Sequence, residues 1–235
     1  MVILQVEKVN KCFGELVAIK NVSFEVEKGE IFGIAGPNGA GKTTLFNLIS
    51  GMLRGSGNII FDNLNISILR PDQVCHRGIA RIFQIPVAFP TLTVFRNVEV
   101  GAHFGMQGTQ RKKENINEVI NFVGLQGKES VVVAGIDLFS KKLTMLAAAL
   151  ATKPKLLLLD EPIGGLSPVE SRQFVELVRK INKELGVTII VIEHLMKVLT
   201  EICHRLMILH YGEKICIGPP KEVVEDSKVR EIYLA

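Results

Sequence analysis

A glycine-rich stretch near the start of the chain carries the residue types that hold a triphosphate. It fits the pattern G-x-x-x-x-G-K-[ST] and consists of Gly36, Pro37, Asn38, Gly39, Ala40, Gly41, Lys42, Thr43 and Thr44. The glycines let backbone N–H groups approach phosphate oxygens without a colliding side chain. Lys42 can place its ammonium group on the β- and γ-phosphates, and the Thr43 hydroxyl can ligate Mg²⁺. The stretch therefore predicts a site for a nucleoside triphosphate with Mg²⁺.

The elements around this stretch are those that a phosphate-binding loop needs. An apolar run at 31–35 predicts a buried strand before it, and the pattern at 44–49 predicts a helix after it. The helix would aim the positive end of its dipole at the phosphates. Because strand, loop and helix occur in this order, we favour this interpretation over a glycine turn that happens to contain a lysine.

Two carboxylates follow an aliphatic run later in the chain. Four leucines at 156–159 lead directly into Asp160 and Glu161. In a parallel α/β sheet, such a strand delivers its acids to the carboxyl edge, where ligands bind. Asp160 suits Mg²⁺, directly or through water, and Glu161 is placed to orient or deprotonate an attacking water. Alone the pair also fits an ordinary exit from a strand; beside the phosphate loop we favour the hydrolytic interpretation.

Three further side chains are candidates for contacts with the nucleotide, and two of them, Gln84 and His194, stand where strands are expected to end. Gln84 follows a strand at 79–83, and its amide could contact Mg²⁺ or its water. His194 could donate to a γ-phosphate, and Phe13 could stack on adenine. Each has an ordinary alternative: Gln84 as a loop glutamine, His194 as a structural histidine and Phe13 as a partly buried core phenylalanine.

Composition limits the class of protein. The chain has 235 residues, 47% of them hydrophobic, which is enough for one large α/β domain or a core with a smaller subdomain. A net charge of +4 is spread out, and the dense spots at 111–113 and 141–142 are interpreted as solvated loop charge rather than a nucleic-acid surface. The four separated cysteines indicate a reducing compartment without a zinc site. The early polar residues and short apolar runs predict neither a signal peptide nor a membrane span.

The periodicity predicts an α/β core interrupted by a helical insertion. Residues 1–85 and 153–235 alternate strands and helices, whereas about 86–152 shows mainly helical periodicity. Within the insertion, helices are expected at 93–100, 113–123 and 141–152, with an exposed loop from Gly101 to Gly108. The core strands are expected near 2–9, 15–27, 31–35, 58–61, 79–83, 156–159, 187–192, 205–210 and 214–217, and its helices at 44–49, 71–77 and 168–185 and at the C-terminus.

In this order, the motifs resemble the nucleotide-binding subunit of an ABC transporter across essentially the whole chain. The stretches 36–47, 78–84 and 192–196 and the ending 229–235 look like the ATP-binding subunits of branched-chain amino acid importers. The lipopolysaccharide-export ATPase is a close cousin with a similar tail, so it stays an alternative. The resemblance implies an ABC-type P-loop ATPase fold in one nucleotide-binding domain, with an antiparallel β subdomain and a helical subdomain.

The resemblance also implies roles and partners. It makes Phe13 the adenine-stacking aromatic, Gln84 the Q-loop residue, Asp160 the Mg²⁺-site acid, Glu161 the catalytic base and His194 the switch histidine. ATP and Mg²⁺ would bind between two head-to-tail ATPase subunits, each site completed by the other subunit's signature helix. Transmembrane permease subunits, and indirectly a solute-binding protein, would be the remaining partners. The chain would sit peripherally on the cytoplasmic membrane face, without nucleic acid.

The signature segment departs from the family pattern. No glycine occurs from Ile136 to Ile163, and Ser140 is the residue that could match the signature serine. Alanines stand at 147–149 where an arginine is common, and Ser167 stands where Asp or Asn is usual. Glycine matters there because backbone N–H groups must come close to the partner's γ-phosphate. We therefore predict a heterodimer with a related subunit; a poorly hydrolysing ATP-dependent scaffold is the alternative.

Two other classes are disfavoured. A soluble ABC ATPase acting on DNA or ribosomes would need a coiled-coil insertion or a second cassette, and 235 residues leave room for neither. A phosphate-loop kinase would need a lid over an acceptor substrate, and the helical insertion with Gln84 and His194 fits the transporter order better.

Overall fold

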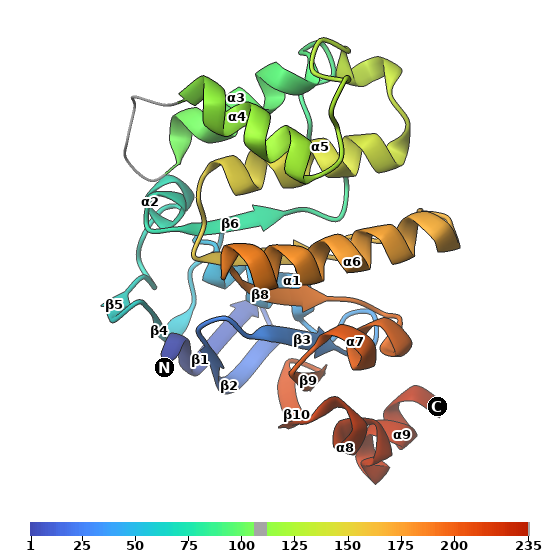
Figure 1. The fold of residues 1–235 in the computed structure, drawn as a ribbon. Helices are drawn as coiled ribbons and strands as arrows, with labels where there is room; N and C mark the ends of the chain where they lie inside the picture. Colours follow the sequence, from blue (N-terminus) through green and yellow to red (C-terminus); the bar gives the residue numbers. More distant parts are fainter. Residues whose placement is uncertain (106–111, 235) are drawn as a thin grey trace.

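Two sheets and a group of helices make up the fold (Figure 1). The computed structural model describes residues 1–105 and 112–234. The smaller sheet is antiparallel, in the order β2-β1-β4-β5. Its strands are β1 (Val2–Phe13), β2 (Leu16–Glu27), β4 (Ser56–Phe61) and β5 (Leu64–Asn65).

The larger sheet is parallel except at one edge. Its order is β10-β9-β3-β8-β7-β6, and only β10 runs antiparallel to its neighbour. Its strands are β3 (Ile31–Ala35), β6 (Ile79–Ile82), β7 (Leu156–Asp160), β8 (Thr188–Ile192), β9 (Arg205–His210) and β10 (Glu213–Gly218). Strands β3, β7 and β8 are buried at every residue, as expected for parallel strands covered on both faces. The carboxyl ends of these strands therefore meet along one edge.

The helices of the α/β core are mostly short, apart from α6. They are α1 (Lys42–Ile49), α2 (Pro71–His76), α6 (Pro168–Leu185), α7 (Met196–Ile202), α8 (Pro220–Glu225) and α9 (Ser227–Leu234). Helix α6 begins with a capping box in which Ser167 accepts from the Glu170 N–H, while the Glu170 carboxylate accepts from the Ser167 N–H. Serine is one of the best residues for this position, so the departure at Ser167 keeps the helix start intact.

A separate group of helices lies beyond strand β6, at the top of Figure 1. It contains α3 (Val94–Phe104), α4 (Lys112–Phe122), α5 (Leu138–Ala151) and the 3₁₀ turn η2 (Val133–Gly135). Fully buried apolar side chains from all three helices join one continuous core with the side chains of β6 and β7, among them Val94, Val98, Ile116, Ile120, Leu146 and Leu150. The fold is therefore an α/β sheet with an antiparallel β part and a helical part.

The loop expected from Gly101 is wrong at its start. Helix α3 continues through Gly101 to Phe104, and the rest of the expected loop, from 106 to 108, lies outside the described residues. A Cβ atom added to Gly101 would lie 2.0 Å from the Ala148 carbonyl oxygen on α5. The backbones of α3 and α5 therefore touch at this point, which only glycine allows. The alanines at 147–149 fit this close approach.

Replacing Gly101 with alanine is expected to destabilise the protein. Alanine gains about 1 kcal/mol of helix propensity over glycine, but forcing two helices apart costs about 3 kcal/mol, so the free energy of unfolding should fall by about 2 kcal/mol. Urea denaturation followed by circular dichroism measures this. Gly135→Ala is the control, because a Cβ atom added at Gly135 would meet nothing within 4 Å and stability should change little. Equal stability of both variants would contradict the close packing.

Candidate nucleotide-binding site

The phosphate-binding loop runs from the end of β3 into α1 and packs tightly on its surroundings. Gly36 has φ +154°, and a Cβ atom there would lie 2.0 Å from the Leu209 carbonyl oxygen. Gly41, at the N-cap of α1, has φ +101°, and its Cβ would lie 2.5 Å from the Ala18 carbonyl oxygen. Both conformations and both close approaches require glycine. The loop is thereby fixed with the N-terminus of α1 at its end, where anions bind favourably.

Lys42 is held inside this loop. Its side chain is buried, and Nζ donates to the carbonyl oxygens of Gly36 at 2.7 Å and Pro37 at 2.9 Å. Burial lowers the pKa of Lys42, while the carboxylates of Glu161 and Asp160 oppose that shift. An ammonium group has three donors, so one of them stays available for a phosphate oxygen while the other two hold the loop.

A cavity of about 700 Å³ brings most of the predicted site residues together. Its wall contains Phe13 from the end of β1, Gln84 beyond β6, and Glu161 and His194 beyond β7 and β8. Its remaining lining residues are Leu16, Val17, Ala18, Asn38, Gly39, Ala40, Gly41, Lys42, Thr43, Thr44 and Tyr211. Sequence reasoning missed Tyr211. The available signal was an aromatic residue in the turn between the strands expected at 205–210 and 214–217. The cavity can hold an extended anionic ligand with an aromatic group at one end.

The Glu161 carboxylate is the point where three of the predicted side chains meet. Gln84 Nε2 donates to Glu161 Oε2, and His194 Nε2 contacts Glu161 Oε1. Glu161 has φ +47°, and its backbone N–H donates to the Ile192 carbonyl at 2.9 Å, which ties it to the end of β8. A carboxylate at the floor of a phosphate-binding cavity can accept a proton from water. Gln84 and His194 each occupy one acceptor position on a different oxygen, which leaves further lone pairs for such a water.

Asp160 lies beneath the cavity rather than in its wall. Its side chain is 4% exposed, and Oδ2 accepts from Arg81 Nη2 at 2.8 Å. Burial raises the pKa of Asp160, and the Arg81 guanidinium opposes that rise. Sequence reasoning missed Arg81, although a cation within an apolar strand next to Gln84 was a signal.

The donor chemistry at this place fits Mg²⁺. Thr43 offers a hydroxyl, Asp160 a carboxylate and Gln84 an amide oxygen, all hard oxygen ligands of the kind that Mg²⁺ prefers. In the part of the chain that the structure describes, no three His, Cys, Asp or Glu side chains form a metal cage of their own.

Two buried charged side chains, those of Lys142 and Glu193, hold the loop after β7. Lys142 on α5 is 4% exposed, and its Nζ donates to the Pro162 carbonyl at 2.7 Å. Glu193 accepts from the backbone N–H groups of Ile163 at 3.1 Å and His194 at 3.3 Å. Burial raises the pKa of Glu193 to about 7. These contacts connect α5 to the strand ends that carry Glu161 and His194.

Interpreting the basic pair at 141–142 as solvated loop charge is therefore wrong for Lys142. Both residues lie on α5, and the ammonium group of Lys142 is buried against the loop after β7. The other basic cluster, at 111–113, lies outside the residues whose side chains the structure describes.

The segment expected to serve as the signature begins with an acid. Helix α5, expected from 141, starts at Leu138 with Asp137 as its N-cap. Asp137 accepts from the Ser140 N–H at 2.7 Å and from the Ser140 hydroxyl at 2.8 Å, and Lys128 Nζ donates to that hydroxyl at 2.8 Å. The Ser140 N–H holds the pKa of Asp137 below its usual range. Ser140 thus lies within the first helical turn, and an ionised carboxylate already occupies the helix N-terminus.

Together, the parallel sheet, the glycine loop and the acids at the neighbouring strand ends define a P-loop nucleotide-binding domain. A family model described as ABC transporter matches residues 19–164. The chain belongs to this family as an ATP-binding domain.

Relatives and solved structures agree with this assignment. The methionine import ATP-binding protein MetN of Carboxydothermus hydrogenoformans is 36% identical over 220 residues, covering 92% of this chain and 63% of that protein. MetN 2 of Listeria monocytogenes EGD-e is 35% identical over 228 residues, covering 93% of this chain and 67% of that protein. The chain thus spans about two thirds of the length of these relatives.

Two solved structures share the fold. An ATP-binding cassette of an ABC transporter in its ADP conformation has a TM-score of 0.90 with 31% identity, covering 100% of this chain and 99% of that one. A dimeric cassette in a post-hydrolysis state, bound to ADP and Pi, has a TM-score of 0.81 with 26% identity, covering 92% of this chain and 98% of that one.

Proposed function

We propose that the chain is the ATP-hydrolysing subunit of an ABC importer for amino acids. The observation that carries this proposal is the convergence of Gln84 and His194 on the Glu161 carboxylate, beside the phosphate-binding loop. In this proposal Glu161 is the base for the attacking water, His194 contacts the γ-phosphate, and Gln84 reports on the metal and its water. The test is Mg²⁺-dependent release of phosphate from ATP by the purified chain in complex with its partner ATPase subunit.

The nucleotide would be held mainly by the phosphate-binding loop. Lys42 would bind β- and γ-phosphate oxygens, and the backbone N–H groups of the loop would surround the phosphates, with Thr44 at the start of α1. Mg²⁺ would take the Thr43 hydroxyl, Asp160 directly or through water, and Gln84. When bound, the ion would neutralise charge on the β- and γ-phosphates as the bond between them breaks.

We place Phe13 under the adenine ring. It ends β1 at the rim of the cavity, is 46% exposed, and has Lys11 Nζ 5.1 Å from its ring centroid. An exposed ring at the rim suits stacking on a base more than filling a core.

Phe13→Ala should weaken ATP binding about tenfold, because stacking of a base on an aromatic ring is worth about 1–3 kcal/mol. Isothermal titration calorimetry with ATP and with inorganic tripolyphosphate measures this. Tripolyphosphate has no base, so its affinity should stay the same in the variant. An equal loss for both ligands would assign Phe13 to the structure of the loop instead.

The transported solute is the next part of the proposal. The relatives named above are methionine import proteins, and the motifs at 36–47 and 78–84 resemble branched-chain amino acid importers. We propose branched-chain or related amino acids, with lipopolysaccharide export as the alternative. Proteoliposomes containing the chain, its permease and its binding protein would distinguish these. ATP turnover should rise with leucine, valine or methionine in the binding protein, and stimulation by lipopolysaccharide alone would reject import.

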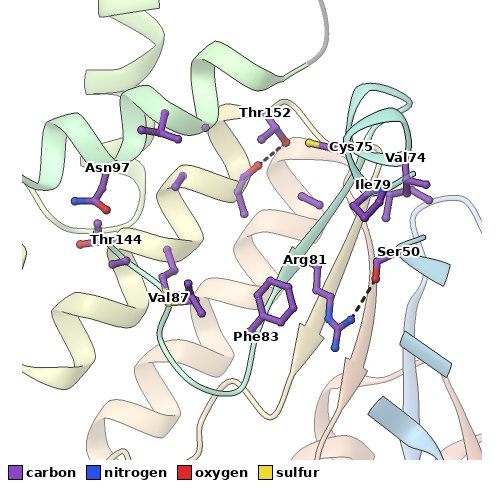
Figure 2. A pocket seen from close by; sticks show the side chains of 18 of the residues that line it. Ser50, Val74, Cys75, Ile79, Arg81, Phe83, Val87, Asn97, Thr144 and Thr152 are labelled. Carbon is purple, nitrogen blue, oxygen red and sulfur yellow. Dashed lines mark hydrogen bonds between the residues drawn. The ribbon is translucent and has the colours of Figure 1, made fainter. Parts of the chain in front are cut away.

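An apolar groove next to β6 is the proposed contact with the permease. Figure 2 shows it between β6 and the helices α3 and α5, with Phe83 and Val87 pointing into it. The groove encloses about 340 Å³, and nearby apolar side chains stay exposed, with Ile85 at 74%, Val87 at 68% and Phe89 at 54%. These residues closely follow Gln84 in the chain. A permease segment seated there would contact the segment that leads from β6 through Gln84.

The proposed location follows from this contact. Among residues 1–105 and 112–234, none of the helices combines the length and apolar character that crossing a bilayer requires. We propose that the chain sits peripherally on the cytoplasmic face of the membrane, held there by permease subunits.

The second ATPase subunit is proposed to be a related chain rather than another copy of this one. At the start of α5, the Asp137 carboxylate already accepts hydrogen bonds from the N–H and hydroxyl groups of Ser140. In a head-to-tail dimer, this is the place where a partner's phosphate would bind. Lys128 Nζ, 3.8 Å from Asp137 Oδ2, offsets part of the negative charge, but the carboxylate still occupies the N–H group of Ser140 that a phosphate would need. The partner's signature would instead complete the site that contains Glu161.

A further inference from the structure

Arg81 is a buried cation with three acceptors on two different parts of the fold. Its side chain, on strand β6, is 5% exposed. Nη2 donates to Asp160 Oδ2 at 2.8 Å, while Nη1 donates to Asn47 Oδ1 at 2.6 Å and Ser50 Oγ at 3.2 Å. Figure 2 shows the guanidinium with its bond to Ser50, beside the apolar groove. One side chain therefore joins the end of β7 to helix α1 and the residue just after it.

Two aromatic rings hold the guanidinium in place. Its central carbon lies 4.7 Å from the ring centroid of Phe83 and 5.6 Å from that of Phe46. Its Nε atom is buried and has no hydrogen-bond partner among the described residues. The guanidinium is therefore oriented to satisfy the acceptors on α1 and β7, although this leaves one buried donor unpaired, which is unfavourable.

We propose that Arg81 is a positioning residue that fixes the Asp160 carboxylate relative to α1, and thereby sets how tightly the site takes Mg²⁺ with a nucleotide. The inference rests on the proposed Mg²⁺ role of Asp160 and Thr43. Arg81 engages Oδ2 and fixes the plane of the carboxylate, which leaves Oδ1 as the oxygen for the metal or its water. Because α1 also carries Thr43, the guanidinium holds two proposed metal ligands in one geometry.

The shape of the guanidinium matters for this role as much as its charge. Its planar fork can donate to acceptors on two sides at once, whereas a lysine ammonium at the end of a flexible chain cannot span the same three acceptors. A lysine at position 81 would keep a cation beside Asp160 and lose part of the connection to Asn47 and Ser50. The Arg81→Lys variant therefore separates the effect of the guanidinium's shape from the effect of its charge. It also keeps a cation beside Asp160, so that the carboxylate is not left without a charged partner in the folded protein.

Binding of a fluorescent ADP analogue, titrated with Mg²⁺, tests the proposal without relying on turnover. In Arg81→Met, the Mg²⁺ concentration for half-maximal binding should rise about tenfold, because the Asp160 carboxylate loses the charged hydrogen bond that orients it. Affinity measured without Mg²⁺ should change less than about twofold, because the phosphate-binding loop is untouched. Arg81→Lys should show a rise of at least about threefold, since it retains the charge but not the fork.

The chain offers a matched control elsewhere in the sheet. Arg205 begins β9, donates to Glu30 at 2.7 and 2.9 Å, and lies 5.5 Å from the Phe32 ring centroid. Arg205→Met removes a similar arginine–carboxylate pair at the amino end of its strand, away from the carboxyl ends that form the site. It should lower the melting temperature and leave the Mg²⁺ dependence of binding at the wild-type value.

The outcomes separate a positioning role of Arg81 at the metal site from a purely structural role. An Arg81→Met protein whose Mg²⁺ dependence matches that of Arg205→Met would overturn the proposal, as would an Arg81→Lys protein with the wild-type value. If Arg81→Met does not fold, Arg81→Lys alone decides. Wild-type protein whose binding ignores Mg²⁺ would instead reject the proposed metal site, and the role of Arg81 with it.

Discussion

The Glu161→Gln variant is expected to bind ATP as tightly as the wild-type protein and to hydrolyse it about 10²–10⁴ times more slowly. Glutamine keeps the size of the side chain and can still contact Gln84 and His194, but it cannot accept a proton from water. The loss corresponds to about 3–5 kcal/mol of transition-state stabilisation. Steady-state phosphate release in the complex with the partner ATPase subunit, alongside equilibrium binding of ATP, measures both quantities.

Glu170→Gln is a suitable control for the change in charge. Glu170 closes the capping box of α6 and is not among the residues that line the nucleotide cavity, so turnover of the variant should match the wild type. Turnover within a few-fold of wild type in Glu161→Gln would remove Glu161 from the role of base. A parallel loss of ATP affinity would assign it to binding rather than to the chemical step.

Mixing this chain with a related ATPase subunit that has a glycine-containing signature should raise ATP turnover about 100-fold over the chain alone. In a pair of identical chains, each nucleotide would face Asp137 where backbone donors are needed. Preorganised donors to a developing charge are each worth about 10²–10³ in rate, so a signature with free N–H groups should restore that amount. Phosphate release at fixed total protein, over a range of mixing ratios, measures the effect.

The same mixture identifies the competent site. Glu161→Gln in this chain should abolish the stimulated turnover, whereas the matching substitution in the added subunit should leave most of it. Rapid turnover by this chain alone would show that the Asp137–Ser140 segment works as a signature and would contradict the heterodimer. A stimulated rate that is lost only when the added subunit is mutated would place hydrolysis at the other site.

Local sequence was enough to predict the parts of the site that depend on local geometry. Each of these features, the glycine loop, the acids after the aliphatic strand and Gln84, is indicated by its own neighbours in the sequence. The structure brings the loop, Glu161, Gln84 and His194 to one cavity. Parallel strands place all their carboxyl ends at one edge, so a strand pattern alone implies this convergence. The fold class is confirmed for the same reason.

Other features depended on packing between distant segments and could not be predicted. The residue type of Gly101 indicates a loop, yet α3 continues through it in close contact with Ala148. The pair of lysines that includes Lys142 indicates solvated charge, yet the Pro162 carbonyl, twenty positions along the chain, accepts from its ammonium group. Arg81 stands within the motif at 78–84, yet nothing in that motif indicates its role, because its three acceptors come from residues 47, 50 and 160. Such partners become neighbours only in the folded chain.

The left-handed backbone of Glu161, at φ +47°, carries a conformational strain of its own. For a residue with a Cβ atom this region costs about 1–3 kcal/mol, and the bond from its N–H to Ile192 helps to hold it there. The main chain therefore fixes the direction of the bond from Cα to Cβ, while Gln84 and His194 orient the carboxylate at the end of the side chain. The protein thus gives up some stability to start the Glu161 side chain towards the nucleotide cavity.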